Sequence, residues 1–222
     1  MEDQCARHKT GFVRMAVSTQ RFAIAAVSVL AIGLVVSFAL TRGGDDPFAA
    51  CRQGVVAGGA GTIGGPFTLV DQTGRTVTDA DVITRPSLLY FGYTFCPDIC
   101  PLDTARNAEA VDALEEMGHE VTPVFISIDP KRDTPEVMAE FASIMHPRMI
   151  ALTGTEEQVR AASQAYRTYY KAQPASDDYY LVDHSTQTYL VLPGHGFVEY
   201  FNRDVTPEQM AERTACFIEA AR

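Results

Sequence analysis

Cys96 and Cys100 are the residues best placed to do chemistry, because they stand four positions apart where an aromatic, apolar run gives way to a helical pattern. Residues 88–93 have the composition of a buried strand. If a helical turn begins between the cysteines, residues four apart share a face and both sulfur atoms point to one spot. The free N–H groups of that helix favour thiolate over thiol. Such a pair can undergo redox chemistry or bind a soft metal ion.

A structural disulfide is the plainer interpretation of the same pair, since exported cysteines usually pair for stability. A bridge between Cys96 and Cys100 would close a very short loop, however. Closing a short loop removes little chain entropy from the unfolded state and therefore stabilises the fold little. The residues favour a functional role for the thiols, and they leave redox chemistry and metal binding both open.

A metal site at the two thiols needs a further ligand, and His184 is the best placed of the five histidines. The others are His8, His119, His146 and His195. His184 lies in residues 179–185, just before a predicted core strand, in a segment that can fold over the cysteines. His146 ends a predicted helix, where a cation is favourable, and His195 lies in a glycine turn that we expect to be exposed. A lone histidine is more often structural than a ligand, so the residues alone leave the role of His184 open.

The donor types narrow the choice of metal. Two thiolates and an imidazole are a three-coordinate set that suits Cu(I). A structural zinc site takes four protein ligands, and an iron–sulfur cluster takes four cysteines at characteristic spacings. The sequence offers neither pattern.

Alternating strand and helix patterns must position these side chains. The predicted order begins with a hairpin (66–70 and 75–78), strand 88–93, helix 101–117 and strand 121–128. A helix from 135, with Thr134 or Asp133 as its cap, and strand 149–152 follow, and then a helix opened by the capping box of Thr155 and Gln158. Strands 188–192 and 197–201 and a helix opened by the capping box of Thr206 and Gln209 complete the order. This order predicts an α/β fold with a mixed sheet and flanking helices. A thiol pair where the first core strand meets its helix fits the thioredoxin-like architecture.

Apolar stripes on the predicted helices indicate which faces are buried. The stripes are Ala108, Val111 and Leu114 on the first helix, Val137, Met138, Phe141, Ile144 and Met145 on the second, and Val159, Ala162, Tyr166 and Tyr169 on the third. We expect all of these side chains to face the core.

A long uncharged stretch in the N-terminal quarter of the chain indicates a membrane anchor. Residues 22–40 carry no charge, and their length of roughly 28 Å as a helix matches a bilayer core. A cleaved signal peptide is the alternative, but its apolar core is usually shorter. Basic residues lie mostly before the span, which predicts a cytoplasmic segment at 1–21 and an exported domain. Residues 41–65 are rich in glycine and predict a flexible linker, which leaves residues 66–222 as the domain.

The charge excludes one class of partner. The formal net charge is −10, although residues 1–42 carry an excess of basic residues. The domain is therefore strongly acidic, which argues against nucleic acid as its partner. The charge by itself names no substrate.

Four motifs together resemble the Sco/SenC family of copper proteins. They are YTFCPDICP at 93–101, DPKRDTP at 129–135, LTGT at 152–155 and YLVDHS at 180–185. The resemblance runs from about Gly65 to the last helix and includes the single anchor. It implies a thioredoxin-like fold, a copper site of Cys96, Cys100 and His184 that holds Cu(I) or Cu(II), and a role in maturing the CuA centre of cytochrome c oxidase. Asp129 and residues 131–134 also match, but we interpret them as a strand end, a turn and a helix cap, outside the site.

Three functions are then open. The first is a metallochaperone in the bacterial inner membrane, with its domain in the periplasm, that passes copper to the copper-accepting oxidase subunit. Other periplasmic copper chaperones or thiol reductases are further expected partners. The second is a thiol–disulfide reductase that keeps the oxidase cysteines reduced, with Cys96 and Cys100 as its redox pair. Against it, the spacing exceeds C-x-x-C by one residue, and no proline stands just before the strand at Thr188, where thioredoxins place a cis-proline. The third is a redox or copper sensor.

Two more cysteines lie outside the motifs. Cys51 is in the linker, and Cys216 lies in the last helix, away from the apolar stripe of Met210, Phe217 and Ile218. Both follow the predicted anchor and so face an oxidising compartment. We predict a disulfide between Cys51 and Cys216 that ties the linker to the domain.

Overall fold

A computed structural model describes residues 46–52, 62–174 and 179–222, together with helical positions at 24, 27, 28, 31–34, 36 and 37. The chain divides into two units, Met1–Asp46 and Pro47–Arg222. Within these described ranges, no helix has both the length and the apolar character needed to cross a membrane. Most of the predicted anchor at 22–40 and of the predicted linker at 41–65 lies outside the described residues.

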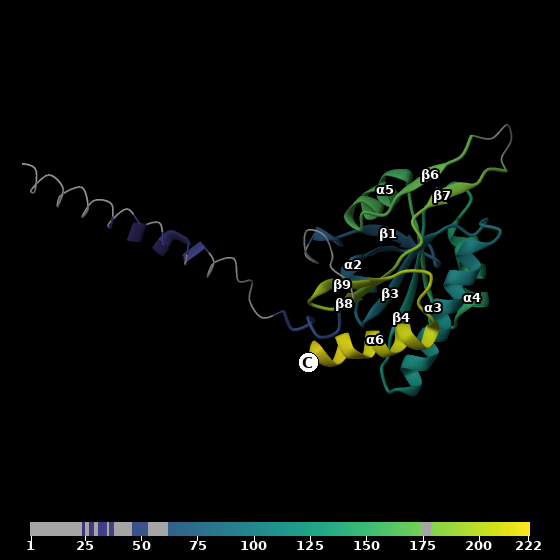
Figure 1. Ribbon diagram of the computed structural model, residues 1–222. Coiled ribbons are helices and arrows are strands. Elements are labelled where there is room, and N and C mark those ends of the chain that lie inside the picture. The colour runs from purple at the N-terminus through teal and green to yellow at the C-terminus, as the bar shows by residue number, and fades with distance from the viewer. Residues whose placement is uncertain are drawn as a thin grey trace, which may run out of the picture. The chain divides into compact units, whose positions relative to one another are not determined.

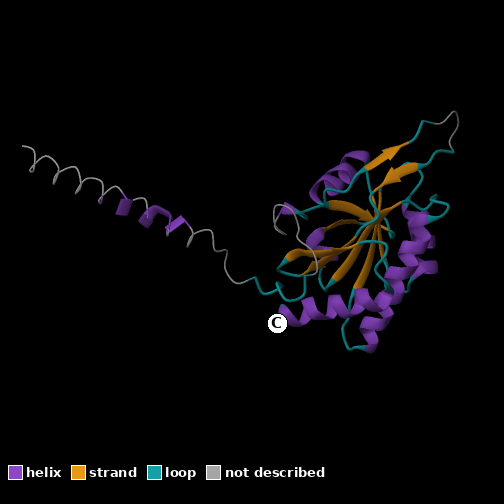
Figure 2. Ribbon diagram, viewed as in Figure 1, coloured by secondary structure: helices purple, strands orange, loops and turns teal. Residues whose placement is uncertain are grey.

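A seven-stranded mixed sheet forms the centre of the larger unit (Figure 2). Its order is β2 (Thr76–Thr78), β1 (Thr68–Asp71), β5 (Ile150–Thr153), β4 (Thr122–Ser127), β3 (Ser87–Gly92), β8 (Thr188–Leu192) and β9 (Gly196–Phe201). The three central strands β3, β4 and β5 run parallel, and every other pairing is antiparallel. The predicted hairpin, mixed sheet and closing antiparallel pair are confirmed.

Five helices flank this sheet in the described part of the unit. They are α2 (Asp79–Val82), α3 (Ile99–Glu116), α4 (Pro135–Met145), α5 (Glu156–Ala165) and α6 (Pro207–Ala220). In Figure 1, α3, α4 and α6 lie along one side of the sheet and α5 along the other. The predicted capping boxes open α5 and α6, and Thr134 caps α4 by accepting a hydrogen bond from the Val137 N–H. Caps of this kind satisfy N–H groups that have no partner within the helix.

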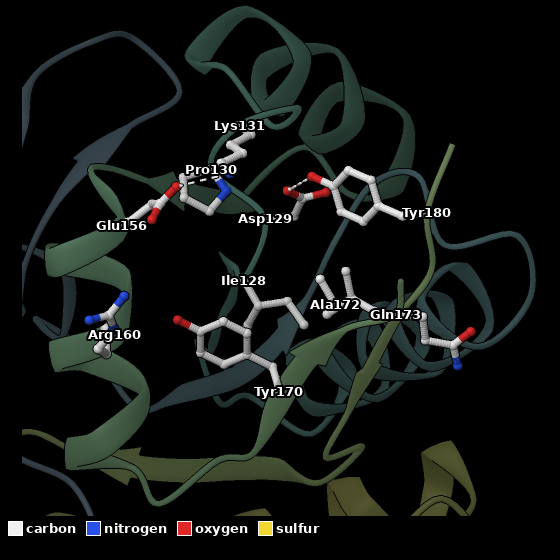
Figure 3. Close-up of a pocket in the computed structure, with 11 residues that line it drawn as sticks. Ile128, Asp129, Pro130, Lys131, Glu156, Arg160, Tyr170, Ala172, Gln173 and Tyr180 are labelled. Atoms are coloured by element: carbon white, nitrogen blue, oxygen red, sulfur yellow. Dashed lines mark hydrogen bonds and ion pairs between the residues drawn. The ribbon is translucent and has the colours of Figure 1, made fainter. Parts of the chain in front are cut away.

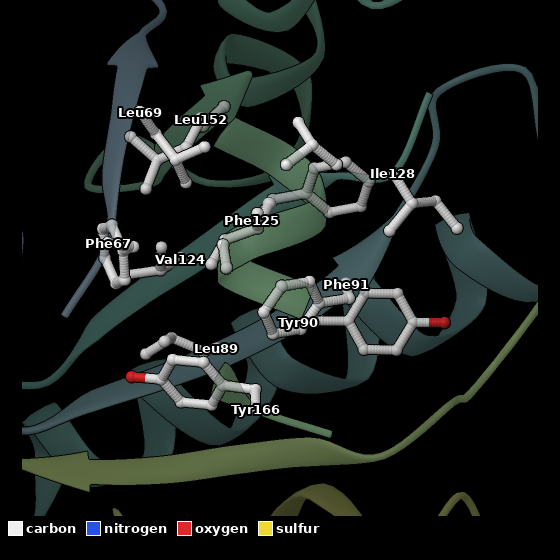
Figure 4. Packing of buried hydrophobic residues seen from close by; sticks show 14 of the residues in the cluster. Phe67, Leu69, Leu89, Tyr90, Phe91, Val124, Phe125, Ile128, Leu152 and Tyr166 are labelled. Atoms are coloured by element: carbon white, nitrogen blue, oxygen red, sulfur yellow. The ribbon is translucent and has the colours of Figure 1, made fainter. Parts of the chain in front are cut away.

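The core explains why the central strands are so apolar. All six residues of β3 are buried, because helices cover both faces of the sheet. Aromatic side chains of β3 and β4 and of Tyr166, the residue after α5, belong to one cluster, in which Phe91, Phe125 and Tyr166 are nearly inaccessible (Figure 4). Burying one such side chain stabilises the fold by roughly 1.5–3 kcal/mol. The predicted stripe of Ala108, Val111 and Leu114 is buried as well.

Two predicted core positions are wrong. Ile144 is 71% exposed, because α4 is short and buries only Met138 and Ala142 against the domain. Tyr169 is 57% exposed, because α5 ends at Ala165 and Arg167 then takes a left-handed backbone conformation with φ of 52°. The chain turns there, so Tyr169 no longer shares a helical face with Tyr166.

A second, two-stranded sheet was not predicted. It pairs β6 (Tyr170–Ala172) with β7 (Val182–His184), and Tyr170 lies opposite His184. This hairpin projects beyond the main sheet beside α5 (Figure 1). Each strand has only three residues, too few to produce a recognisable alternating pattern. The hairpin matters because it ends in the predicted ligand.

Candidate metal site

The two cysteines lie at the junction of β3 and α3. The chain leaves the sheet at Gly92, and α3 begins at Ile99 rather than at Pro101 as predicted. Cys96 therefore precedes the helix while Cys100 lies in its first turn. The Cys100 N–H donates to Cys96 Sγ at 3.3 Å, so the sulfur of Cys96 occupies the position of a helix cap. Both residues are free thiols; Cys100 is fully buried and Cys96 is partly exposed.

Gly92 makes room for the second sulfur. A Cβ atom at this position would lie 3.1 Å from Cys100 Sγ, 2.9 Å from the Tyr90 ring and 3.0 Å from the Phe125 ring. These contacts are too short for a side chain to fit without displacing its neighbours. We did not single out Gly92 from the sequence, although a glycine at the end of a buried strand is a signal of close approach.

His184 reaches the cysteines from β7. Its Nε2 lies 3.3 Å from Cys100 Sγ, and its Nδ1 lies 2.7 Å from the carbonyl oxygen of Ser185. A carbonyl only accepts hydrogen bonds, so Nδ1 carries the proton and the lone pair of Nε2 points at the sulfur. The rings of Tyr90 and Tyr93 meet the imidazole nearly at right angles, at centroid distances of 6.2 and 5.9 Å. These contacts select one tautomer and one ring orientation.

The three predicted ligands therefore come together. Cys96, Cys100 and His184 place one sulfur, a second sulfur and a ring nitrogen within 4.8 Å of one another. It is the single group of three or more metal-ligating side chains among the described residues. A hollow of about 340 Å³, lined in part by Cys96, Pro97, Leu181 and His184, opens beside it. Two soft sulfur donors and one imidazole fit Cu(I) better than a hard cation such as Mg²⁺ or Ca²⁺.

Burial and hydrogen bonds shift the pKa values of the three predicted ligands in different directions. Burial alone would raise the pKa of the Cys96 thiol, but hydrogen bonds, chiefly from the Cys100 and Asp98 N–H groups, lower it below its ordinary value. Burial raises the pKa of the Cys100 thiol, which therefore keeps its proton at neutral pH. Burial also lowers the pKa of His184, so the imidazole is neutral and has a lone pair to offer.

A polar network supports the site from the α3 side. The hydroxyl of Tyr90 donates to Asp103 Oδ2 at 3.0 Å, and Arg203 Nε donates to Asp103 Oδ1 at 3.1 Å. Asp103 is buried in the first turns of α3, close to Cys100. The Tyr90 ring that faces His184 is thus held at its far end by a charge-assisted hydrogen-bond network.

A second network fixes the loop that leads to Cys96. The buried Asp133 carboxylate accepts from Thr94 Oγ1 and from Ser127 Oγ, each at 2.6 Å. Thr94 precedes Cys96 by two residues, and Ser127 ends β4. Asp133 therefore ties the cysteine loop to the neighbouring strand, a role that our prediction of a helix cap did not include.

Asp129 and Arg132, which we placed outside the site, lie beside it. Arg132 Nε donates a hydrogen bond to Asp129 Oδ2. The Tyr180 hydroxyl donates to Asp129 Oδ1 at 2.7 Å (Figure 3). Burial and the Asp129 carboxylate raise the pKa of Tyr180 to about 12, so its hydroxyl stays protonated. The family motif DPKRDTP was the sequence signal that could have placed these residues at the site. Their interpretation as a strand end, a turn and a helix cap accounted for the backbone and not for these side-chain contacts.

The other histidines described by the structure lie away from the thiols. His146 ends α4, where it is buried with Nε2 3.1 Å from Asp112 Oδ1, and His195 is exposed in its turn, as predicted. His119 Nε2 lies 3.7 Å from Glu219 Oε1, and His8 falls outside the described residues. Cys51 and Cys216 are joined by a disulfide across a separation of 165 residues.

Comparison with known proteins identifies the family. A sequence profile described as SCO1/SenC matches residues 56–219. Protein SenC of Rhodobacter capsulatus is 54% identical over 208 residues, which are 93% of this chain and 94% of that protein. The structure of Arabidopsis thaliana ScoI with copper bound is similar with a TM-score of 0.68 and 38% identity, over 71% of this chain and 99% of that one. BsSco, described as a member of the Sco family of cytochrome c oxidase assembly proteins, is similar with a TM-score of 0.55 and 25% identity, over 68% of this chain and 91% of that one. The thioredoxin-like fold is thereby confirmed, and the chain belongs to the SCO1/SenC family.

Proposed function

We propose that this protein binds copper through Cys96, Cys100 and His184 and hands it to another protein. One observation carries the proposal: two sulfur atoms and a ring nitrogen meet within 4.8 Å, although His184 lies 84 positions after Cys100. Cys96 is partly exposed beside an open hollow, so an incoming ligand can reach the ion. Accessible copper with three protein ligands suits transfer by ligand exchange.

The recipient that we propose is the copper-accepting subunit of cytochrome c oxidase, at the stage when its CuA centre is assembled. Membership of the SCO1/SenC family supports this choice. BsSco is described by its structure as belonging to a family of oxidase assembly proteins, and Arabidopsis ScoI was solved with copper. Copper is then a cargo that the domain holds for a time.

Copper titration of the reduced full chain tests the binding step. We expect one equivalent of Cu(I) to bind, and His184→Ala to weaken binding while the fold is kept. In cells, the same variant should lose assembly of the oxidase copper centre. Full assembly by His184→Ala, without stoichiometric copper on the protein, would contradict the carrier role.

A thiol–disulfide reductase is the second candidate, and the unequal thiols favour it. The Cys96 thiol has a lowered pKa and partial exposure, which suits a nucleophile, while Cys100 is buried. In this reaction the Cys96 thiolate attacks a disulfide of the oxidase subunit and releases one of its thiolates. Cys100 then loses its proton and attacks the Cys96 sulfur, which releases the second thiolate. The partner gains two electrons, and a dithiol reductant must later reduce the new disulfide between Cys96 and Cys100. Under this reading His184→Ala should leave reductase activity and assembly largely intact.

We also propose that residues 22–40 anchor the chain in a bacterial inner membrane, with residues 1–21 in the cytoplasm and the domain at 66–222 in the periplasm. The uncharged span, the basic residues before it and the bond between Cys51 and Cys216 support this placement, since disulfides persist in oxidising compartments. Protease protection should show the domain outside the cytoplasm. Intact mass after blocking free thiols, with and without reduction, should show one disulfide.

A further inference from the structure

Arg132 lies where the segment with the cysteines meets the hairpin with His184. Its guanidinium carbon is 3.7 Å from the ring centroid of Tyr180, 4.8 Å from that of Phe95 and 5.6 Å from that of Tyr93. Phe95 adjoins Cys96 in the chain, and Tyr180 lies two residues before β7, the strand that ends in His184. One cation therefore contacts both halves of the candidate metal site, and a guanidinium plane is the side chain best suited to stacking on several aromatic rings.

The guanidinium is itself held in place. Arg132 and Asp129 form an ion pair between side chains that are only 13% and 5% exposed. The turn between β4 and α4 that carries them is closed by bonds from the Arg132 and Asp133 N–H groups to the Asp129 carbonyl, at 3.1 and 3.0 Å. The guanidinium of Arg132 is thus fixed in position, and Tyr180, just before β7, stacks on it.

The hairpin meets the main core through Val182, which is buried, and through Tyr170 and Tyr180, which are partly buried against it. The sheet of β6 and β7 is separate from the main sheet, and an isolated pair of short strands is marginally stable. A hollow of about 390 Å³, lined by Tyr170, Ala172 and Gln173 among others, adjoins the hairpin (Figure 3). Gln173 also lines the hollow of about 340 Å³ beside the thiols. Gln173 and Val182 thus line both hollows, and the hairpin contacts the rest of the domain between them, at Val182 and Tyr180.

Those contacts converge on the Arg132 cluster. The Val182 N–H donates to the Tyr93 hydroxyl at 3.2 Å, and the Tyr180 hydroxyl donates to Asp129. Tyr93 and Tyr180 are two of the three rings under the guanidinium. The imidazole of His184 in turn rests on the Tyr93 ring.

We propose that Arg132 is the positioning residue that holds His184 over Cys96 and Cys100, by stacking on Tyr180 and Tyr93. Loosening this stacking frees the imidazole from a bound copper ion and leaves the two sulfur atoms in place. Cys100 belongs to α3, and the Asp133 carboxylate holds the loop before Cys96 through Thr94. Copper with one ligand fewer is more open to an acceptor. The inference deepens the proposed carrier function, on which it rests for the identity of the metal.

A double-mutant cycle with Arg132→Lys and His184→Ala tests the inference. Lysine keeps the charge but loses the planar guanidinium. Cu(I) affinity of the full chain is measured by competition with a chelator. We expect Arg132→Lys to lower the affinity about tenfold, as for loss of an outer partner of a metal ligand. In the His184→Ala background it should change the affinity less than about twofold, because the effect then has no route to the metal. An equal loss in both backgrounds, or no loss in either, overturns the proposal.

Amide hydrogen exchange of the copper-free chain gives a second, metal-independent readout. Arg132→Lys should speed exchange of the β7 amides about tenfold and leave those of β3 unchanged. Unchanged exchange in β7 overturns the proposal. If the wild-type chain fails to bind Cu(I), the proposed function fails, and this measurement still decides whether Arg132 holds the hairpin.

Two further variants complete the design. Arg85→Lys is the matched control, because Arg85 pairs with Glu120 on the surface before β3 begins, at the end of the strand away from the cysteines. It should change neither affinity nor exchange. If Arg132→Lys does not fold, as judged by circular dichroism, Tyr180→Phe replaces it in the same cycle. That variant removes one hydroxyl and its bond to Asp129, and it is judged by the same outcomes at a smaller expected size.

Discussion

The cysteine turn and the histidine hairpin contribute to one site, yet they are built in opposite ways. Cys100 lies in the first turn of α3, a helix of 18 residues, and the loop before it comes from a strand whose six residues are all buried. That strand pairs on both sides, with β4 and β8. His184 ends a three-residue strand that pairs only with β6 in a sheet of its own. Elements that move in binding are drawn from the less stable parts of a fold. The contrast suggests that the thiols hold the ion while the imidazole controls its release.

Removing a thiol should have the largest effect. Cys100→Ser keeps the shape of the side chain but replaces a soft sulfur donor with oxygen, which Cu(I) binds poorly. We expect Cu(I) affinity to fall by more than the roughly 100-fold that marks the loss of an outer partner. Chelator competition measures the affinity, and circular dichroism checks the fold. A smaller loss than that of His184→Ala would reverse the roles assigned to the turn and the hairpin.

Hydrogen exchange of the copper-free wild-type chain compares the two regions directly. Amides of β3 should exchange only when the domain unfolds, whereas those of β7 exchange by local opening. We expect β7 to exchange at least about 100-fold faster than β3. The measurement is two-dimensional NMR or mass spectrometry in heavy water. Equal protection of the two strands would show that the hairpin is as firmly held as the sheet.

The pH dependence of Cu(I) affinity should be set by the cysteine thiols of the turn and not by His184 of the hairpin. Copper binds the thiolate, and burial raises the pKa of Cys100, so binding at neutral pH must release its proton. The lowered pKa of His184 leaves the imidazole already neutral there. Affinity should therefore rise about tenfold per pH unit between pH 6 and 8 for each proton released. Flat affinity over this range would mean that no thiol proton is lost, contrary to the burial of Cys100.

Gly92→Ala should damage the turn selectively. The added Cβ would press on Cys100 Sγ, Tyr90 and Phe125, and overpacking of this kind costs about 1–3 kcal/mol of unfolding free energy. Cu(I) affinity should fall as well, because the sulfur is displaced. Gly65→Ala is the matched control, since its Cβ would meet only Ala165, at an ordinary 3.4 Å. Chemical denaturation of both variants measures the difference, and equal stability of the two would refute the close fit at Gly92.

Tyr93→Phe should have the smallest effect, confined to the hairpin. It removes the hydroxyl that accepts the Val182 N–H and keeps the ring against His184. One net hydrogen bond is worth about 1 kcal/mol, so β7 amides should exchange up to about fivefold faster. The β3 amides serve as the internal control. A global loss of protection would indicate that Tyr93 supports the whole domain rather than the hairpin.

Much of the fold followed from local pattern, and the failures have local causes. Capping boxes at Thr155 and Thr206 marked two helix starts correctly, because their side chains bond to backbone within three residues. Ile144 failed because a helical stripe shows which residues share a face and not how far the neighbouring elements cover it. Tyr169 failed because α5 ends at Ala165, before the stripe reaches it. The hairpin of β6 and β7 failed because three residues are too few to establish a period.

The site followed a similar division. The spacing of Cys96 and Cys100 already implied that both sulfur atoms face one spot, since a helical turn is a local structure. The pairing of His184 with them rested on a resemblance between whole motifs, and the structure places its Nε2 at 3.3 Å from Cys100 Sγ. The roles of Asp133 and Arg132 were missed, because they depend on contacts with segments far away in the chain. The role of Gly92 depends on how closely the Tyr90 ring, the Phe125 ring and Cys100 Sγ pack around it.

The sequence by itself thus determined the thiol pair, its place at a strand–helix junction, the mixed α/β fold and the family to which the chain belongs. These depend on interactions over a few residues or on motifs read in order. Only the tertiary structure decided which side chains surround the sulfur atoms, which tautomer His184 adopts and what holds its hairpin in place. Those features arise where segments from different parts of the chain pack together, and local sequence does not encode the distances between them.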